Sequence, residues 1–135
     1  MSNMKLLLTS ILILICSSIY CQSAEIAVPF ISYEEKHQDI GEIKLGDKKS
    51  GEFVFTNNTK QDLKIELVSA CECTTLDWTR SAIAPGKQGK VTYIFDSSEK
   101  EESETIDVDI YFENINPSDG NPYFDIASYK YVLIK

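Results

Sequence analysis

Hydrophobic and polar residues alternate along most of the chain, in short segments that are separated by turn residues. The alternation is clearest where Leu63, Ile65 and Leu67 are separated by Lys64 and Glu66. A period of two is typical of a strand that buries one face. Similar segments occur at 30–35, 41–46, 53–56, 91–95, 106–112 and 123–134. The pattern therefore predicts about seven short strands, and no segment shows a helical period long enough to compete.

Turn residues indicate how these segments connect. Asp47–Lys49 and Asn57–Lys60 are polar turn sequences, and the second predicts a hairpin between the segments that flank it. Pro85-Gly86 predicts a turn, because proline presets φ and glycine accepts a positive φ. This turn lies in the longest connection, which runs from Ser69 to Gly89, while Asn116–Pro122 is the most loop-like stretch of the chain.

Short strands, hairpins and one longer crossing connection predict an all-β fold. We expect an immunoglobulin-like antiparallel Greek-key β-sandwich over residues 24–135. Trp78 is expected to cover one end of its core. The core itself is predicted to consist of Phe53, Phe55, Leu63, Ile65, Leu67, Val91, Tyr93, Phe95, Ile106, Val108 and Ile110.

The N-terminal residues 1–23 are predicted to be a signal peptide. Lys5 precedes an apolar run that ends near Tyr20, and this run is shorter than the about 17–25 apolar residues that span a bilayer. Cleavage is expected after Cys21 or after Ser23. A lipid on Cys21 is disfavoured because the bulky Tyr20 precedes it. The prediction is export to the periplasm or cell envelope of a bacterium, with secretion as the alternative, and no transmembrane segment after processing.

Composition and charge narrow the classes of function. Hydrophobic residues make up 43% of the chain and charged residues 25%, with a formal net charge of −8. Nucleic acids and anionic membranes attract cationic surfaces, so neither is an expected partner. One histidine and no cofactor motif predict a protein that is not an enzyme and holds no cofactor. We therefore expect a binding or structural module of the envelope, with another envelope protein or a glycan as partner.

Several short motifs resemble a known bacterial family, the domain of unknown function 1573. The most specific are Cys71-Glu72-Cys73-Thr74 and Ile83-Ala84-Pro85-Gly86. The others are Asp39–Ile43, Gly46, Phe53–Asn57, Leu63–Ile65, Gly89–Val91 and Phe95-Asp96. The resemblance implies an exported immunoglobulin-like β-sandwich, similar in architecture to modules that bind proteins in cilia and centrosomes. It implies no catalytic residue, because the family has no assigned activity.

The chain departs from the family pattern at two places. Glu72 stands between the cysteines, where the family usually has glycine. Gln38-Asp39-Ile40-Gly41 stands where the family often has His-Asp-Phe-Gly, and His37 comes one position early.

Cys71 and Cys73 are the sharpest chemical feature, and three interpretations stay open. Residues i and i+2 of an extended strand lie about 6.6 Å apart, at the edge of the about 4.4–6.8 Å range of disulfides, and a turn at Glu72 would shorten the distance. Two thiolates on one face suit Cu(I), which gives an alternative function in soft-metal binding or thiol redox exchange. The third interpretation is two small half-buried packing residues.

Other chemistry-bearing residues are expected to be structural. His37 is predicted to lie on the surface, and a hydrolase would need a concave pocket that joins it to two carboxylates. Asp107 and Asp109 lie on one strand face and can share a calcium ion, but a solvated acidic face is the favoured interpretation.

The aromatic residues near the C-terminus raise a separate hypothesis. If Tyr111, Tyr129 and Tyr131 all face outward, they form an adhesive stripe for a protein or a glycan. Otherwise, they cap the core with their hydroxyl groups in water. The aromatic residues considered together are Trp78, Tyr111, Tyr123, Phe124, Tyr129 and Tyr131.

Overall fold

The computed structural model describes residues 26–135, so the predicted signal peptide and Cys21 lie outside the described residues. Eight strands account for most of this part of the chain, and it contains no helix that is long and apolar enough to cross a membrane. The strands are β1 (Ile31–Tyr33), β2 (His37–Lys44), β3 (Lys48–Asn57), β4 (Ile65–Ser69), β5 (Thr74–Trp78), β6 (Gln88–Asp96), β7 (Thr105–Ile115) and β8 (Pro122–Ile134).

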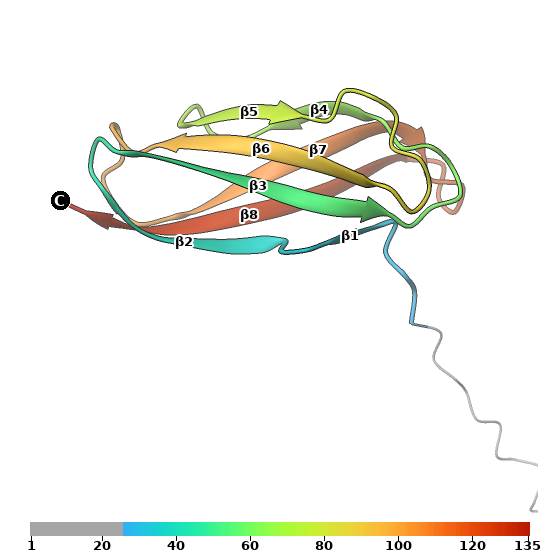
Figure 1. Ribbon diagram of the computed structural model, residues 1–135, viewed down its shortest axis with the longest axis horizontal. Helices are drawn as coiled ribbons and strands as arrows, with labels where there is room; N and C mark the ends of the chain where they lie inside the picture. The colour runs from blue at the N-terminus through green and yellow to red at the C-terminus, as the bar shows by residue number, and fades with distance from the viewer. Residues whose placement is uncertain (1–25) are drawn as a thin grey trace, which may run out of the picture.

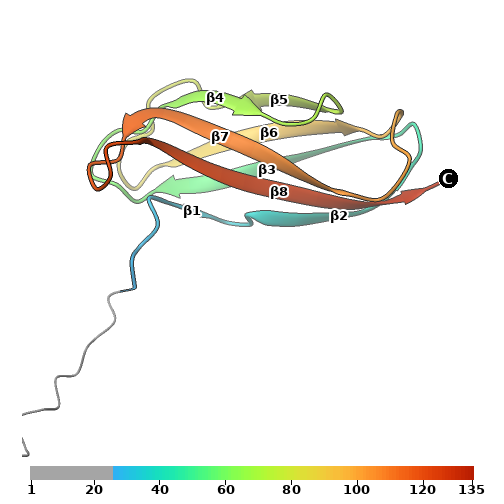
Figure 2. The same ribbon diagram turned by 180° about the vertical axis from the view of Figure 1, so that it is seen from behind.

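The strands form two four-stranded sheets that pack face to face. One sheet has the order β1-β3-β6-β5 and lies in front in Figure 1. The other has the order β2-β8-β7-β4 and lies in front in Figure 2. The predicted all-β sandwich is therefore confirmed. One pair departs from the antiparallel expectation, because β2 runs parallel to β8. The chain crosses from the first sheet to the second between β1, which is antiparallel to β3, and β2.

The core lies between the two sheets and is rich in aromatic rings. Every predicted core residue is buried except Leu67, which is 50% exposed. A bulge between Ile65 and Leu67 in the pairing of β4 with β7 explains the error. An extra residue in a strand moves the following side chains to the other face. Val68 therefore takes the buried position instead. Trp78 is half-buried and packs against the core, as expected.

The predicted hairpin across the Asn57–Lys60 turn is wrong. β3 pairs with β1 and β6, whereas β4 pairs with β7 in the other sheet. The turn carries the chain from one sheet to the other. Alternation shows that each strand buries one face, but it does not specify the strand beside it. The turn predicted at Asp47–Lys49 also lies earlier, because β3 already begins at Lys48.

The long connection after β4 contains a strand that the sequence pattern did not reveal. β5 pairs with β6 from Thr74 to Trp78. Its inward residues are Thr74, Leu76 and Trp78, all only partly buried, so the apolar alternation is weak. The predicted Pro85-Gly86 turn is confirmed, since Gly86 has a φ of 75° and Lys87 N donates to Ala84 O over 3.0 Å.

A buried asparagine holds this turn to the end of β3. Asn57 Nδ2 donates to Gln61 O and to Ile83 O, each over 2.8 Å. Its Oδ1 accepts from Thr59 N at 2.9 Å and from Thr59 Oγ1 at 2.7 Å. Ile83 pairs with Leu63 in an isolated bridge. The side chain of Asn57 therefore holds the turn that follows β3 and ties it to Ile83, which is 26 residues away in the sequence.

Candidate functional site

The two cysteines lie in the turn that precedes β5, and a disulfide joins them. Their Cα atoms are 5.2 Å apart, so the turn at Glu72 shortens the distance well below that of an extended strand. Thr74 N donates to Cys71 O over 3.0 Å and closes this turn. The disulfide is the interpretation that this geometry favours. The metal interpretation requires the reduced thiols.

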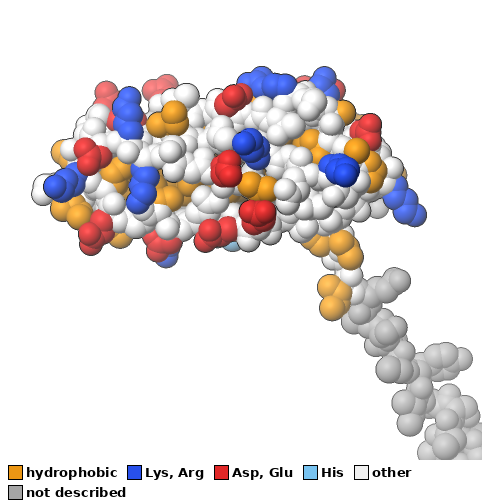
Figure 3. All heavy atoms as spheres, viewed as in Figure 1, with side chains coloured by type: hydrophobic (Ala, Val, Ile, Leu, Met, Phe, Trp, Pro, Cys, Tyr) orange, Lys and Arg blue, Asp and Glu red, His pale blue; other side chains and the backbone are white. Residues whose placement is uncertain are grey.

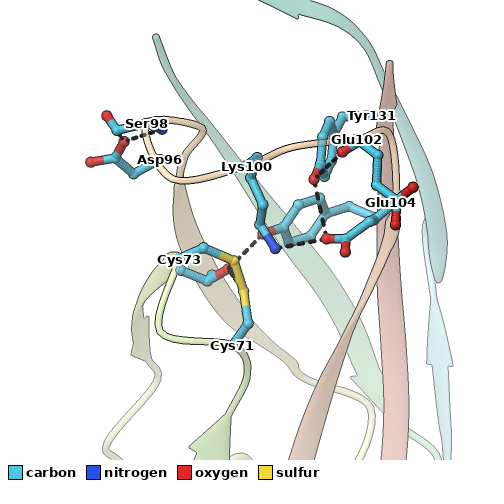
Figure 4. The surroundings of a disulfide bond; sticks show 10 residues. Cys71, Cys73, Asp96, Ser98, Lys100, Glu102, Glu104 and Tyr131 are labelled. Atoms are coloured by element: carbon cyan, nitrogen blue, oxygen red, sulfur yellow. Dashed lines mark hydrogen bonds and ion pairs between the residues drawn. A yellow bond between two sulfur atoms is a disulfide. The ribbon is translucent and has the colours of Figure 1, made fainter. Parts of the chain in front are cut away.

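The hydroxyl groups of Thr74 and Tyr129 connect the disulfide, which is drawn in Figure 4, to the core. Cys71 Sγ lies 3.3 Å from Thr74 Oγ1, and Thr74 Oγ1 lies 2.5 Å from the hydroxyl of Tyr129. The Tyr129 ring stacks on Tyr93 with centroids 4.5 Å apart. Burial raises the pKa of Tyr129, and it raises the pKa of Tyr93 to about 12. Both phenols therefore stay neutral and act in packing and hydrogen bonding.

The solvent side of the disulfide is acidic. A shallow hollow beside it is lined by Glu72, Cys73, Asp96, Ser98 and Glu99. The hydroxyl and backbone N–H of Ser98 bind the carboxylate of Asp96 and lower its pKa, so this charge persists. Negative charge raises the pKa of a nearby thiol and disfavours its reactive thiolate form.

The lysine drawn near the disulfide in Figure 4 is already paired. Lys100 Nζ lies 2.7 Å from Glu104 Oε2, and the hydroxyl of Tyr131 donates to the same carboxylate oxygen over 3.2 Å. Bonding to Lys100 lowers the pKa of Glu104. Over residues 26–135, no three side chains of the types that bind metals gather in one place. Cu(I) binding by Cys71 and Cys73 thus remains a prediction that would use the two sulfurs alone.

His37 lies on the surface at the start of β2, as expected. Its Nδ1 is 2.8 Å from the Oγ of the buried Ser128. The hollow beside it is lined by His37, Gln38, Thr105, Ser128 and Lys130, without a carboxylate. The arrangement that a hydrolase would require is therefore not assembled around this histidine in the described part of the chain.

The aromatic residues of β7 and β8 divide between the two faces of their sheet. Tyr129 and Tyr131 are buried in the core, so the stripe of three outward tyrosines is not formed. Tyr111 does face outward, and Phe124 of the neighbouring strand packs on it with ring centroids 4.9 Å apart. Strand pairing places Leu67 beside Tyr111 on the other side.

These outward residues form an apolar patch on the outer face of the sheet β2-β8-β7-β4, which is the sheet in front in Figure 2. We define the outer patch as Leu67, Tyr111, Phe124 and Ile126, whose exposed fractions are 50%, 38%, 44% and 38%. Asp109 pairs with Ile126 across the strands and lies at the margin of the patch. The predicted shared face of Asp107 and Asp109 is confirmed, and these acids flank the outer patch along β7.

The opposite face of the molecule has a different surface. In Figure 3, acidic and basic side chains are interspersed over the sheet that contains β3 and β6. Two ion pairs cross this sheet: Lys48 pairs with Asp96, and Lys90 pairs with Glu52. Ile94 is an exposed apolar side chain of β6 there, at 47% exposure.

Comparison with known families decides where the chain belongs. The family model described as "Protein of unknown function (DUF1573)" matches residues 31–121. The chain belongs to this family. The match covers both cysteines, the Ile83–Gly86 motif and all but the last strand of the DUF1573 domain. No curated protein matches the chain.

Solved structures similar to this DUF1573 domain share its fold. The VesB protease of Vibrio cholerae aligns with a TM-score of 0.61 and 17% identity over 76% of this chain and 32% of that one. A protein of unknown function from Porphyromonas gingivalis has a TM-score of 0.61 and 17% identity, over 79% and 50% of the two chains. PapD-like domain 7 of human CEP192 has a TM-score of 0.60 and 9% identity, over 87% and 96%. The chain thus spans half or less of the two bacterial proteins, and these likenesses show the fold alone.

A further hollow of the DUF1573 domain lies at the end of the sandwich where the described chain begins. Its volume is about 690 Å³, and Phe30, Tyr123, Asn58 and Gln61 contribute to its lining. Asn58 Nδ2 donates to Pro29 O, and Gln61 Nε2 donates to Ile115 O. These amide groups hold the walls of the hollow together.

The sequence pattern placed Tyr111 and Phe124 among the candidate aromatic residues but missed Leu67 and Ile126. Leu67 is outward because of the bulge in β4. Ile126 lies two residues after Phe124 on the same face of β8, and this spacing of two is the signal that identifies it once the strand is assigned.

Proposed function

We propose that this DUF1573 domain is an exported, non-enzymatic module of the cell envelope that binds another protein through its outer patch. The observation that carries the proposal is the contiguous, exposed apolar surface of Leu67, Tyr111, Phe124 and Ile126. Isolated exposed apolar residues are ordinary, but a cluster of aromatic and aliphatic side chains across three strands is typical of interaction sites. Tyrosine and phenylalanine also supply much of the binding energy of protein interfaces.

The charges around the outer patch favour a particular kind of partner. Asp107 and Asp109 lie along β7 on one side of it. Lys64, which lies beside the first residue of β4, is paired with Glu113 at 3.0 Å. The margin is therefore mostly acidic. We propose a partner protein that presents apolar side chains flanked by lysine or arginine, since complementary charge steers association and fixes orientation.

Replacement of the two rings of the patch tests this function. The Tyr111→Ser, Phe124→Ser variant should bind the partner at least about thirtyfold more weakly, because truncation of even one aromatic anchor costs about 2 kcal/mol. Ile94→Ser is the matched control, since Ile94 is equally exposed but on the opposite face. Tagged chains isolated from the envelope of their own cells, after chemical cross-linking, give the readout. The proposal predicts that the wild type and Ile94→Ser retain the same cross-linked protein and that the double variant loses it.

Two outcomes would contradict the proposal. Equal cross-linking of the patch variant and the control would show that the outer patch is not the binding surface. Binding to envelope material that survives complete proteolysis would show that the partner is a glycan. Melting curves of all three chains verify that each one folds.

A thiol function of Cys71 and Cys73 is a second candidate, favoured by the position of Cys73 beside an open hollow. In such an exchange, a thiolate of a dithiol protein attacks Cys73 Sγ, the disulfide breaks, and Cys71 leaves as a thiolate that takes up a proton. A second attack within the partner then releases Cys73 and oxidises the partner. The acidic surroundings oppose this reaction.

The intact mass of the native chain separates the thiol and metal alternatives. A mass lower by two hydrogen atoms than the reduced chain indicates the disulfide, and a mass higher by one copper ion indicates the metal site. In a functional assay, the Cys71→Ser, Cys73→Ser variant should keep partner binding if the outer patch acts alone, and should lose exchange activity if the thiols act.

A further inference from the structure

Among the eight described strands, β5 is the one that contains no fully buried residue. Its inward residues Thr74, Leu76 and Trp78 are only partly buried, whereas those of its neighbour β6 are buried almost completely. β5 also lies at the edge of its sheet, along the upper margin of Figure 1, and pairs with β6 alone. Strands with few buried contacts open locally at a lower free energy than core strands do. The attachment of β5 to β6 therefore depends strongly on how the two ends of β5 are held.

The end of β5 near Trp78 is held by a pair of hydrogen bonds to β6. Thr79 N donates to Lys90 O over 3.0 Å, and Lys90 N donates to Thr79 Oγ1 over 3.0 Å. Arg80 lies 3.7 Å over the Trp78 ring and covers it. These contacts do not involve the disulfide, so this end of the strand stays attached whatever the state of the cysteines.

The other end of β5 is held through the disulfide turn. Asp96 N donates to Cys73 O over 2.9 Å, which binds the turn to the end of β6. The hydroxyl of Thr74 lies 3.3 Å from Cys71 Sγ and 2.5 Å from the hydroxyl of Tyr129 in the core. The disulfide fixes the two cysteines relative to each other. It therefore positions both the carbonyl group that β6 binds and the hydroxyl group that the core binds.

We propose that the disulfide between Cys71 and Cys73 is a redox-sensitive latch on β5. In the oxidised chain, the closed turn holds the first residues of β5 against β6. Reduction lets the two cysteines move independently, so the start of β5 separates from β6 more often while the end near Thr79 stays attached. The open state uncovers backbone groups of β6 around Ile94, which lies opposite Thr75 in the closed sheet. This device acts on the chain's own fold and is independent of the outer patch, which lies on the other sheet.

The reduction is a thiol–disulfide exchange with a dithiol. One thiolate of the dithiol attacks Cys73 Sγ, since Cys73 lines an open hollow. The sulfur–sulfur bond breaks, and Cys71 leaves as a thiolate that takes up a proton. The second thiolate of the dithiol then attacks the dithiol sulfur of the mixed disulfide and releases Cys73, which also takes up a proton. The cysteines have gained two electrons, and the dithiol has become a disulfide. Exchange with a small disulfide in the opposite direction closes the latch.

The carboxylates around the hollow slow the interconversion of the two states. Glu72, Asp96 and Glu99 lie beside Cys73, and negative charge raises the pKa of a thiol. Freed cysteines therefore stay mostly protonated near neutral pH, and a protonated thiol is a poor nucleophile. The same charges repel an anionic thiolate that approaches the closed disulfide. Each state consequently persists until an exchange partner acts on it, as a switch requires.

Hydrogen exchange of the β5 amides tests the latch. Cys73 O and Thr79 N both bond to β6, so the odd-numbered residues between them direct their N–H groups toward β6. A disulfide that closes so short a loop restricts the open state about tenfold. The amide of Thr75 should therefore exchange about tenfold faster after reduction with dithiothreitol. The amide of Asp77, which lies closer to the attached end, should accelerate less, and the amides of β7 inside the other sheet should not change. Re-oxidation should restore the slow exchange of Thr75.

The Cys71→Ser, Cys73→Ser variant is the matched control, because serine is similar in size and cannot form the bond. Its Thr75 amide should exchange at the fast rate with and without dithiothreitol, which separates loss of the bond from any other effect of the reductant. Equal rates at Thr75 in the oxidised and reduced chains would overturn the proposal. So would an equal acceleration in β7, because reduction would then loosen the whole domain. A disulfide that dithiothreitol does not reduce in the folded chain would also overturn it, since the bond would then be a fixed link and not a switch.

Discussion

Substitution of Asn57 is the sharpest test of how the DUF1573 motifs stabilise this fold. Asn57→Ala removes four hydrogen bonds: two donated by Nδ2 to Gln61 O and Ile83 O, and two accepted by Oδ1 from Thr59. Each is worth about 1 kcal/mol, with more lost where a buried group is left without a partner. Ile83 O keeps its bond from Leu63 N, and water can reach part of the turn. We expect a loss of about 2–4 kcal/mol in the free energy of unfolding.

Urea denaturation followed by tryptophan fluorescence measures this loss. Trp78 packs against the core, so its fluorescence reports the unfolding of the core. Asn58→Ala is the matched control: Asn58 is exposed, and its amide donates to Pro29 O at the surface. The control should change stability by less than about 0.5 kcal/mol. A loss below about 1 kcal/mol for Asn57→Ala would refute the argument, because it would mean that the buried amide contributes no more than a surface contact.

Three further predictions concern the core, the tyrosines and the outer patch. Gly89→Ala places a Cβ against the side chains of Ile83 and Phe55, so urea titration should show a loss of about 1–3 kcal/mol from overpacking. Burial raises the pKa of Tyr93 to about 12. The neutral phenol therefore contributes its full stability below about pH 10, and this contribution is lost as the pH rises toward 12. Alkaline unfolding followed by circular dichroism should accordingly depend less steeply on pH in the Tyr93→Phe variant. Tyr111→Ser with Phe124→Ser should lower the free energy of unfolding by no more than about 1–2 kcal/mol, because both rings are exposed and lose mainly their mutual cross-strand contact.

The core could be predicted from the sequence because alternation alone places a residue on the buried or the exposed face. Phe53 and Phe55 are buried for this reason, as are Val91, Tyr93 and Phe95 of β6. The face of the strand on which a side chain lies is a local property, because successive side chains point to opposite faces. Leu67 shows the limit, since a bulge depends on the register with β7 and leaves the local composition unchanged.

The pairing of strands could not be predicted in the same way. The segment after Asn57 had the turn residues and alternation of a hairpin, yet β4 lies in the other sheet. The interactions that separate the two strands are long-range, above all the bonds from Asn57 to Ile83 O and from Leu63 to Ile83. The parallel pairing of β2 with β8 joins strands near the two ends of the domain. No local pattern contains this information.

The candidate sites were predictable to different degrees. Cys71 and Cys73 are close in sequence, so a turn at Glu72 was enough to bring them together, and the structure contains both the turn and the disulfide. The outer patch draws on three strands, and Leu67 and Ile126 join Tyr111 only through the registers of β4, β7 and β8. The sequence left open whether Tyr129 and Tyr131 face outward or cap the core, and the inward face of β8 buries both.

The two most specific motifs of the family resemblance have structural roles in this chain, which bears on where a function can reside. The Cys71–Thr74 motif closes the turn before β5, and Thr74 ties it to Tyr129 in the core. The Ile83–Gly86 motif is the partner of Asn57. A fold-determining motif can be common to domains that bind different partners, because specificity depends on exposed side chains outside it. We propose the outer patch as such a surface. If Asn57→Ala lowers stability while Tyr111→Ser with Phe124→Ser lowers binding, then fold stability and partner binding depend on separate residues. The motifs shared within the family would then identify the scaffold and not the partner.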